Sequence, residues 1–212
     1  MEIIPSILVK TKEEFLEKVI AIEPYVARAH IDIADGIFVP NMTIDGIEEI
    51  EEAETSLQFG VHLMVSKPEN HIHRWLQTPA DRFAFHIEAT KKCGEIIGEI
   101  KEAEKIAGIA LNPKTPISEI EPYIDLLDFV HFMTVEPGFY GSKFIDPVLD
   151  KIRDFHYFYP DKPIQVDGAV DPETAPKLIN AGVSLLVVGS YIWENHDAGK
   201  AIETLRSISN IT

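Results

Sequence analysis

The sequence is poor in cysteine and in positive charge. Cys93 is the one cysteine among 212 residues, so no internal disulfide can form and a small disulfide-held secreted scaffold is excluded. Lys and Arg number 19 against 35 Asp and Glu, which gives a net charge of −16. Such an acidic chain lacks the positive field that attracts phosphate backbones and anionic lipids, so we expect neither a nucleic-acid partner nor a membrane partner.

Long apolar runs are missing as well. No stretch approaches the ~20 consecutive apolar residues that a membrane-spanning helix needs. The first residues, Met-Glu-Ile-Ile-Pro, carry no basic segment ahead of a long apolar run, which a secretory signal would have. We therefore expect a cytoplasmic protein, and a hydrophobic content of 45% with 25% charged residues is typical of a globular chain.

Short apolar runs alternate along the whole chain with longer amphipathic stretches. The expected strands cover 3–8, 29–33, 57–65, 82–87, 106–111, 129–133, 164–166 and 184–188. Between them apolar residues recur at helical spacing, as at Phe15, Val19 and Ile22. Eight strand–helix units without a linker predict one α/β domain over 1–212, a closed (β/α)8 or TIM barrel. An open dinucleotide-binding sheet is disfavoured, because no Gly-x-Gly-x-x-Gly follows the first strand.

Titratable side chains interrupt three expected strands near their carboxyl ends, where barrel enzymes place their active sites. His30 and Asp32 share one face of their strand by parity, and His62 and Asp167 come at the ends of two further strands. Burying such groups unpaired would cost on the order of several kcal/mol each, and a divalent cation would remove that cost. Mixed nitrogen and oxygen ligands suit zinc, iron or manganese better than calcium or magnesium. A single strand histidine is more often a hydrogen-bonded core residue, but the combination predicts a metal-assisted barrel enzyme.

Seven short motifs follow one another along the chain. They read PSIL at 5–8, HIDIADGIFVPN at 30–41, VHLM at 61–64, FHIEA at 85–89, ALNPKTP at 110–116, MTVEPGF at 133–139 and VDG at 166–168. In this order they resemble the ribulose-phosphate 3-epimerase family, and the resemblance spans nearly the whole chain. The block that ends at Asn41 and the MTVEPGF block are the most specific of the seven.

The resemblance implies a barrel of the ribulose-phosphate-binding type with one divalent metal ion, commonly zinc, with iron and manganese as alternatives. Matched motif by motif, the metal ligands fall on His30, Asp32, His62 and Asp167. The family interconverts D-ribulose 5-phosphate and D-xylulose 5-phosphate by inverting C3 through a metal-stabilised enediolate. Asp32 and Asp167 fall on its paired acid and base. The chain is thus expected to be an isomerase of the pentose phosphate pathway whose partner is a small sugar phosphate.

The resemblance also implies a set of substrate-binding residues. Ser6 matches a serine that helps to hold the substrate, and Met64 and Met133 match methionines around the intermediate, although plain core packing explains both methionines equally well. Backbone N–H groups in turns after the last three strands would hold the phosphate. The full set is Ser6, His62, Met64, Met133, Gly138, Gly141, Ser142, Gly168, Ala169, Gly189 and Ser190.

Several positions depart from the family pattern. Tyr140 and Ser142 stand where the family has a glycine and a glutamine. Ala169 replaces a second glycine, and Ala34 replaces a methionine. Ala169 keeps its N–H, so the change matters if the backbone needs a positive φ or the methyl meets the phosphate. Tyr140 adds a ring beside the pocket, and Lys143 would offset a poorer phosphate grip with its charge. The sequence therefore predicts epimerisation more firmly than it predicts the sugar.

Two other functions stay open. A 3-epimerase of another ketose phosphate, such as D-allulose 6-phosphate, would share every catalytic residue, and a non-catalytic sugar-phosphate-binding barrel would share the fold. Barrels of the orotidine-decarboxylase type, which include hexulose-phosphate synthase, fit less well. They carry an Asp-x-Lys-x-x-Asp motif at the end of the second strand, and the corresponding residues 30–35 of this chain contain no lysine. His86 is interpreted as a residue that lines the pocket or supports a ligand, while His131 and the remaining histidines receive no role. The sequence is compatible with a homo-oligomer and fixes no number of copies.

Overall fold

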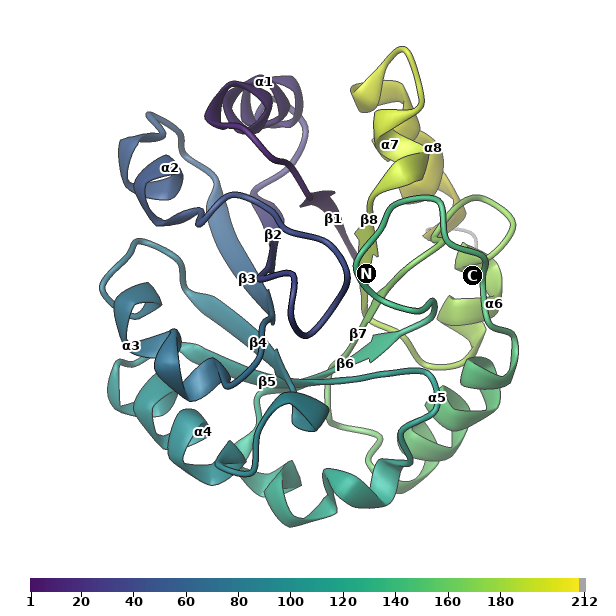
Figure 1. Cartoon of the computed structure of the whole chain (residues 1–212). Coiled ribbons are helices and arrows are strands. Elements are labelled where there is room, and N and C mark those ends of the chain that lie inside the picture. Colours follow the sequence, from purple (N-terminus) through teal and green to yellow (C-terminus); the bar gives the residue numbers. More distant parts are fainter. Residues whose placement is uncertain (210–212) are drawn as a thin grey trace.

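The computed structural model describes residues 1–209, and in that range eight parallel strands close into one barrel (Figure 1). The strands are β1 Glu2–Ile7, β2 Arg28–Ala34, β3 Gln58–Met64, β4 Arg82–His86, β5 Ile106–Leu111, β6 Phe129–Met133, β7 Ile164–Asp167 and β8 Leu185–Val188. Each strand pairs with the next in the chain, and β8 closes the ring against β1. The predicted TIM barrel is confirmed, and every strand end lies within one residue of its expected position.

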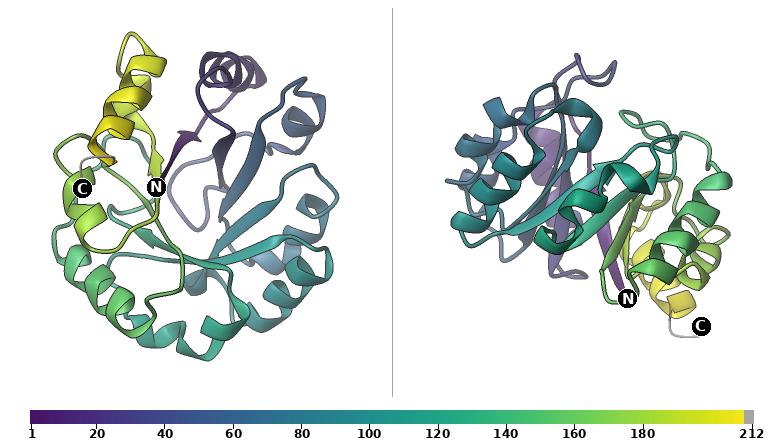
Figure 2. Two further views of the ribbon diagram at one scale, coloured as in Figure 1. Left: turned by 180° about the vertical axis from the view of Figure 1, so that it is seen from behind. Right: turned by 90° about the horizontal axis from the view of Figure 1, so that it is seen from below.

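Helices cover the outside of the barrel, as the side view in Figure 2 shows. They are α1 Lys12–Ile22, α2 Ile47–Glu52, α3 Ile72–Trp75, α4 Cys93–Glu102, α5 Pro147–Phe158, α6 Ala175–Asn180, α7 Ser190–Trp193 and α8 Ala198–Ser209. Short 3-10 turns, Ile117–Glu119 and Glu121–Leu126, take the place of a helix after β5. Among residues 1–209, none of the helices is both long and apolar enough to cross a lipid bilayer.

The main core lies between the strands and the surrounding helices. Alternate residues of each strand face outward, so Ile31 and Ile33 of β2 join the same buried cluster as Phe15 and Ile22 of α1. Parallel strands are covered on both faces, which explains why these segments are nearly all apolar. The polar exceptions therefore lie on the inward face, inside the barrel.

Larger side chains close the amino-terminal end of the barrel interior. The guanidinium of Arg82 lies 4.8 Å from the ring centre of Phe129, and its Nη1 donates to Oε1 of Gln165 at 3.3 Å. Gly108 makes room for this layer, because a Cβ at that position would overlap the Phe129 ring. With this end filled, polar inward residues nearer the carboxyl ends of the strands can face an opening.

Candidate active site

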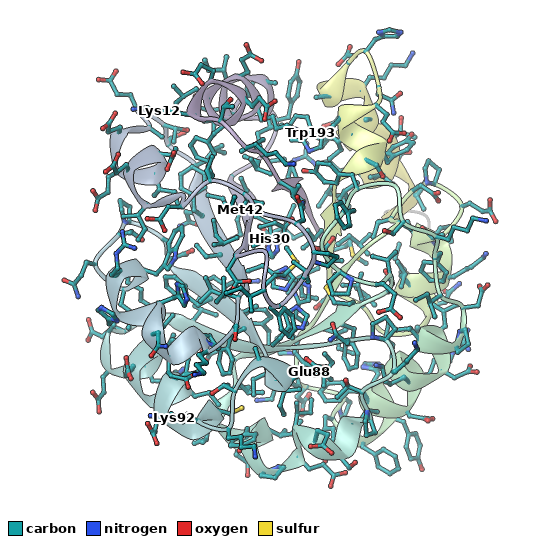
Figure 3. The ribbon with its side chains drawn as sticks, viewed as in Figure 1. Lys12, His30, Met42, Glu88, Lys92 and Trp193 are labelled. Atoms are coloured by element: carbon teal, nitrogen blue, oxygen red, sulfur yellow. The ribbon has the colours of Figure 1, made fainter. Side chains whose placement is uncertain are left out.

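Two histidines and two aspartates meet at the carboxyl ends of β2, β3 and β7. His30 and Asp32 lie on β2, His62 lies on β3 and Asp167 ends β7, and one ligand atom from each lies within 4.8 Å of the others. Figure 3 shows His30 near the middle of the ring of strands. Asp32 stands opposite His62 in the β2–β3 register, and an eight-stranded barrel is narrow enough for β7 to reach both. The structure thus brings together the four side chains that the sequence grouped.

Asp32 is the most heavily contacted member of this cluster. Its Oδ1 lies 2.9 Å from Nδ1 of His62 and 3.5 Å from Nε2 of His30. Its Oδ2 accepts the hydroxyl of Ser6 at 2.5 Å. Burial alone would raise the pKa of Asp32, but the two neighbouring imidazoles, those of His30 and His62, outweigh it and hold this pKa well below its usual value. These surroundings therefore favour the ionised form of Asp32.

Asp167 has the opposite environment. Its side chain is 13% exposed toward the opening, and its Oδ2 lies 4.0 Å from Nδ1 of His62. Burial, and then the nearby charge of Asp32, raise the pKa of Asp167 well above its usual value, although the N–H of Gly168 opposes this. One ionised and one protonated carboxyl group at the same opening can together accept a proton and donate another.

A chain of hydrogen bonds supports His62 from the side of β4. The Nε2 of His62 lies 2.9 Å from Nε2 of His86, and Nδ1 of His86 lies 3.2 Å from Glu88. Glu88 also accepts from the backbone N–H of Asn112 at 2.8 Å and from the hydroxyl of Thr115. Burial would raise the pKa of Glu88, but these bonds, that of His86 first, lower it to about 2. His86 thus contacts a member of the cluster, its support of a ligand stays a prediction, and Glu88 was not singled out.

The proton count along this chain tests whether a metal ion fits. An ionised Glu88 can only accept, so Nδ1 of His86 carries a proton and its Nε2 accepts from His62. Nδ1 of His62 then keeps a lone pair that faces Oδ1 of Asp32, and this contact needs a second proton on His62 or a cation. Nε2 of His30 is buried and has no hydrogen-bond partner within residues 1–209. Two such nitrogens, together with the carboxyl groups of Asp32 and Asp167, fit a divalent transition-metal ion.

His131 belongs to the same interior, although the sequence interpretation gave it no role. Its ring centre lies 4.6 Å from that of His62 and 5.5 Å from that of His30. Its Nδ1 accepts from the amide of Gln165 at 2.7 Å, and burial lowers its pKa well below the usual value. His131 precedes Met133 by two residues on β6, and this parity is the signal that places it inside the barrel.

A cavity opens beside the two aspartates at the mouth of the barrel. Most of the predicted substrate-binding residues line it: Ser6, Met64, Met133, Gly138, Gly141, Ser142, Gly168, Ala169, Gly189 and Ser190. His62, the other member of that set, is fully buried next to Asp32. Leu8, Val135, Phe139 and Tyr140 line the cavity as well. The structure places these residues around one space, and their roles in binding stay predictions.

The turns that line the cavity contain several left-handed residues. Gly138 and Gly168 have φ of 113° and 114°, and Ala169 has φ of 49°, so the alanine occupies a conformation that glycine would adopt more cheaply. For a residue with a Cβ this conformation costs roughly 1–2 kcal/mol. A Cβ on Gly168 would lie 2.5 Å from Val135, so this position requires glycine. Lys143, suggested as a phosphate contact, is exposed and lines a neighbouring hollow instead.

Comparisons with known proteins agree with the geometry. A family model described as the ribulose-phosphate 3 epimerase family matches residues 2–193, which include the whole cluster. The ribulose-phosphate 3-epimerase of Bacillus subtilis (strain 168) is 44% identical over 183 residues, 84% of this chain and 84% of that protein. The chloroplastic ribulose-5-phosphate-3-epimerase of Arabidopsis thaliana is 36% identical over 211 residues, 96% of this chain and 75% of that protein.

A solved structure of a differently named enzyme shares the architecture. The crystal structure of 3-hexulose-6-phosphate synthase aligns with a TM-score of 0.71 over 98% of this chain and 99% of that chain. Its sequence is only 17% identical, so the likeness extends to the fold alone.

Proposed function

The chain belongs to the ribulose-phosphate 3-epimerase family, and we propose that it interconverts D-ribulose 5-phosphate and D-xylulose 5-phosphate. The observation that carries the proposal is the pairing of Asp32 and Asp167, two carboxyl groups in opposite environments beside one cavity. Similarity to a family supports the reaction only by analogy. The acid pair supplies the chemistry that inversion at carbon requires.

Inversion at C3 requires that a proton leaves one face of the carbon and that another arrives on the opposite face. One carboxylate accepts the departing proton, the electron pair of the C–H bond moves toward the C2 carbonyl, and the other carboxylic acid then protonates C3. In the reverse direction the two groups exchange roles. Asp32 and Asp167 reach the cavity from β2 and β7, two strands that are not neighbours in the barrel, so a sugar carbon can lie between them.

The proposal includes one divalent metal ion, with zinc as the first choice and iron and manganese as alternatives. His30, Asp32, His62 and Asp167 would hold it, and the unpartnered Nε2 of His30 and the lone pair on His62 support this. When bound, the ion supplies positive charge that stabilises the oxyanion formed as the C3 proton leaves.

The wall of the cavity would position the sugar phosphate. Ser6 holds its hydroxyl on Asp32, and the sulfur-bearing side chains of Met64 and Met133 are buried, which keeps water from the reacting carbon. The turns after β6, β7 and β8 offer backbone N–H groups for the phosphate. We also propose a cytoplasmic location, because the free thiol of Cys93 suits a reducing compartment.

Exchange in heavy water tests the reaction directly. The protein is incubated with D-ribulose 5-phosphate in D₂O and followed by proton NMR. We expect loss of the C3 proton signal and growth of D-xylulose 5-phosphate labelled at C3. No exchange with this substrate, but exchange with D-allulose 6-phosphate, would replace the pentose by the hexose. No exchange with either would favour the non-catalytic barrel.

A further inference from the structure

Tyr140 connects the loop after β6 to the end of β1. Its hydroxyl donates to the backbone carbonyl of Ser6 at 2.9 Å and accepts the backbone N–H of Leu8 at 2.8 Å. Phe139, the residue before it, is 51% exposed, whereas the ring of Tyr140 is half-buried. A phenol with both hydrogen-bonding roles filled by backbone is held in one orientation.

The ring of Tyr140 also packs against the turn that precedes α7. A Cβ on Gly189 would lie 2.5 Å from Cε1 of Tyr140, so the ring lies directly on the backbone of that turn. The indole N–H of Trp193, labelled in Figure 3, donates to the same Ser6 carbonyl at 2.5 Å. The ammonium of Lys18 lies 3.9 Å from the ring centre of Trp193 and 5.3 Å from that of Tyr140.

These contacts connect the loop, through Ser6, to Asp32. Two donors fix the peptide group of Ser6, and the side chain of the same residue donates to Oδ2 of Asp32. The loop is held at a second point, where the side-chain amide of Asn41 donates to the carbonyl of Gly138 at 2.7 Å. The cavity wall formed by this loop is therefore tied to β1 on one side and to the segment after β2 on the other.

We propose that Tyr140 is a positioning residue that sets the length of the substrate cavity and selects a five-carbon ketose phosphate. The inference rests on the proposed function. A pentulose 5-phosphate has two carbons between C3 and the phosphate, and a hexulose 6-phosphate has three. A wall held at a fixed distance from Asp32 and Asp167 suits one of these lengths, because a misplacement of ~1 Å at the reacting carbon can cost about 100-fold in rate.

The test replaces the hydroxyl alone. Tyr140→Phe keeps the ring on Gly189 and removes both hydrogen bonds to β1. Tyr157→Phe is the matched control, because Tyr157 is 80% exposed on α5. Three quantities are measured: amide hydrogen exchange at Leu8, kcat and KM with D-ribulose 5-phosphate, and kcat/KM with D-allulose 6-phosphate.

We expect Tyr140→Phe to speed exchange at Leu8 by about tenfold, as loss of a partly buried hydrogen bond would. KM for the pentulose phosphate should rise several-fold with a smaller change in kcat. The ratio of kcat/KM for the hexulose phosphate to that for the pentulose phosphate should rise about tenfold. This is the order of magnitude by which a binding pocket discriminates between substrates that differ by one carbon. Tyr157→Phe should leave all three quantities unchanged.

Each failure points to a different error. Unchanged exchange at Leu8 in Tyr140→Phe would overturn the link between the loop and β1. Faster exchange with an unchanged hexulose-to-pentulose ratio would overturn the role in substrate selection. A wild-type protein inactive on both sugars would refute the proposed function and with it the selection, while exchange at Leu8 would still decide the link.

Discussion

The Nε2 atoms of His62 and His86 lie 2.9 Å apart, so the proton between the two rings belongs to one of them. Glu88 decides which one, because its carboxylate accepts from the other nitrogen of His86. The lone pair that His62 presents to Asp32 therefore depends on a carboxylate two hydrogen bonds away. Such outer partners orient metal-binding imidazoles and raise their affinity for the ion.

Replacing Glu88 by glutamine should weaken metal binding. Glu88→Gln keeps the size of the side chain, but its amide can donate to Nδ1 of His86 and so reverse the proton order along the chain. We expect the dissociation constant for Zn²⁺, measured by competition with a chromophoric chelator, to rise about 10–100-fold. Glu95→Gln on α4, whose exposed carboxylate pairs with Lys92 at 3.6 Å, is the control. Equal affinities for the two variants would contradict the orienting role.

Removal of the metal should lower both stability and activity. An ion bound only by the folded chain stabilises it, so a chelator should lower the Tm by on the order of 10 °C at saturating metal. Turnover of D-ribulose 5-phosphate should stop and should return when Zn²⁺ is added back. Elemental analysis of the purified protein checks the loading. Full turnover after verified metal removal would refute the proposal that a metal ion stabilises the oxyanion.

Asp167→Asn should remove one of the two proton carriers. We expect kcat to fall by about 10²–10⁴-fold, because an amide can neither accept nor donate the C3 proton at neutral pH. The measurement is the rate at which D-ribulose 5-phosphate is converted to D-xylulose 5-phosphate, with circular dichroism to check the fold. Asp154→Asn on the exposed face of α5 is the control for the same substitution. Normal formation of D-xylulose 5-phosphate by Asp167→Asn would contradict the two-carboxyl mechanism.

The sequence predicted the barrel and the cluster because both follow from local rules. The apolar runs are bounded sharply, and the parity of His30 and Asp32 follows from the strand itself. His131 obeys the same parity, yet a lone histidine in an apolar run does not indicate that His30 and His62 lie beside it in the fold. The contact of Tyr140 with Ser6 joins positions 134 residues apart, so no local pattern contains it. Such contacts depend on loop conformation, which periodicity does not describe.

The buried histidines make stability depend on pH in the metal-free protein. Burial lowers the pKa of His86 to about 4 and lowers that of His131 well below its usual value. Between pH 6.5 and 4 these two imidazoles therefore bind protons in the unfolded chain that the folded chain excludes, whereas Asp167, whose pKa is raised, acts in the opposite direction. Stability rises with pH wherever the unfolded state binds more protons, so acidification through this window favours unfolding.

His131→Gln should flatten that dependence. We expect the free energy of unfolding of the wild type, measured with urea in the presence of a chelator, to fall between pH 7 and pH 5. Each buried histidine should contribute on the order of 1–2 kcal/mol to the fall. The loss of the bond to Gln165 should lower the stability of the variant at both pH values, so the readout is the difference between them. His196→Gln, at an exposed position, should keep the wild-type difference. An unchanged pH dependence in His131→Gln would show that this ring does not take up a proton on unfolding.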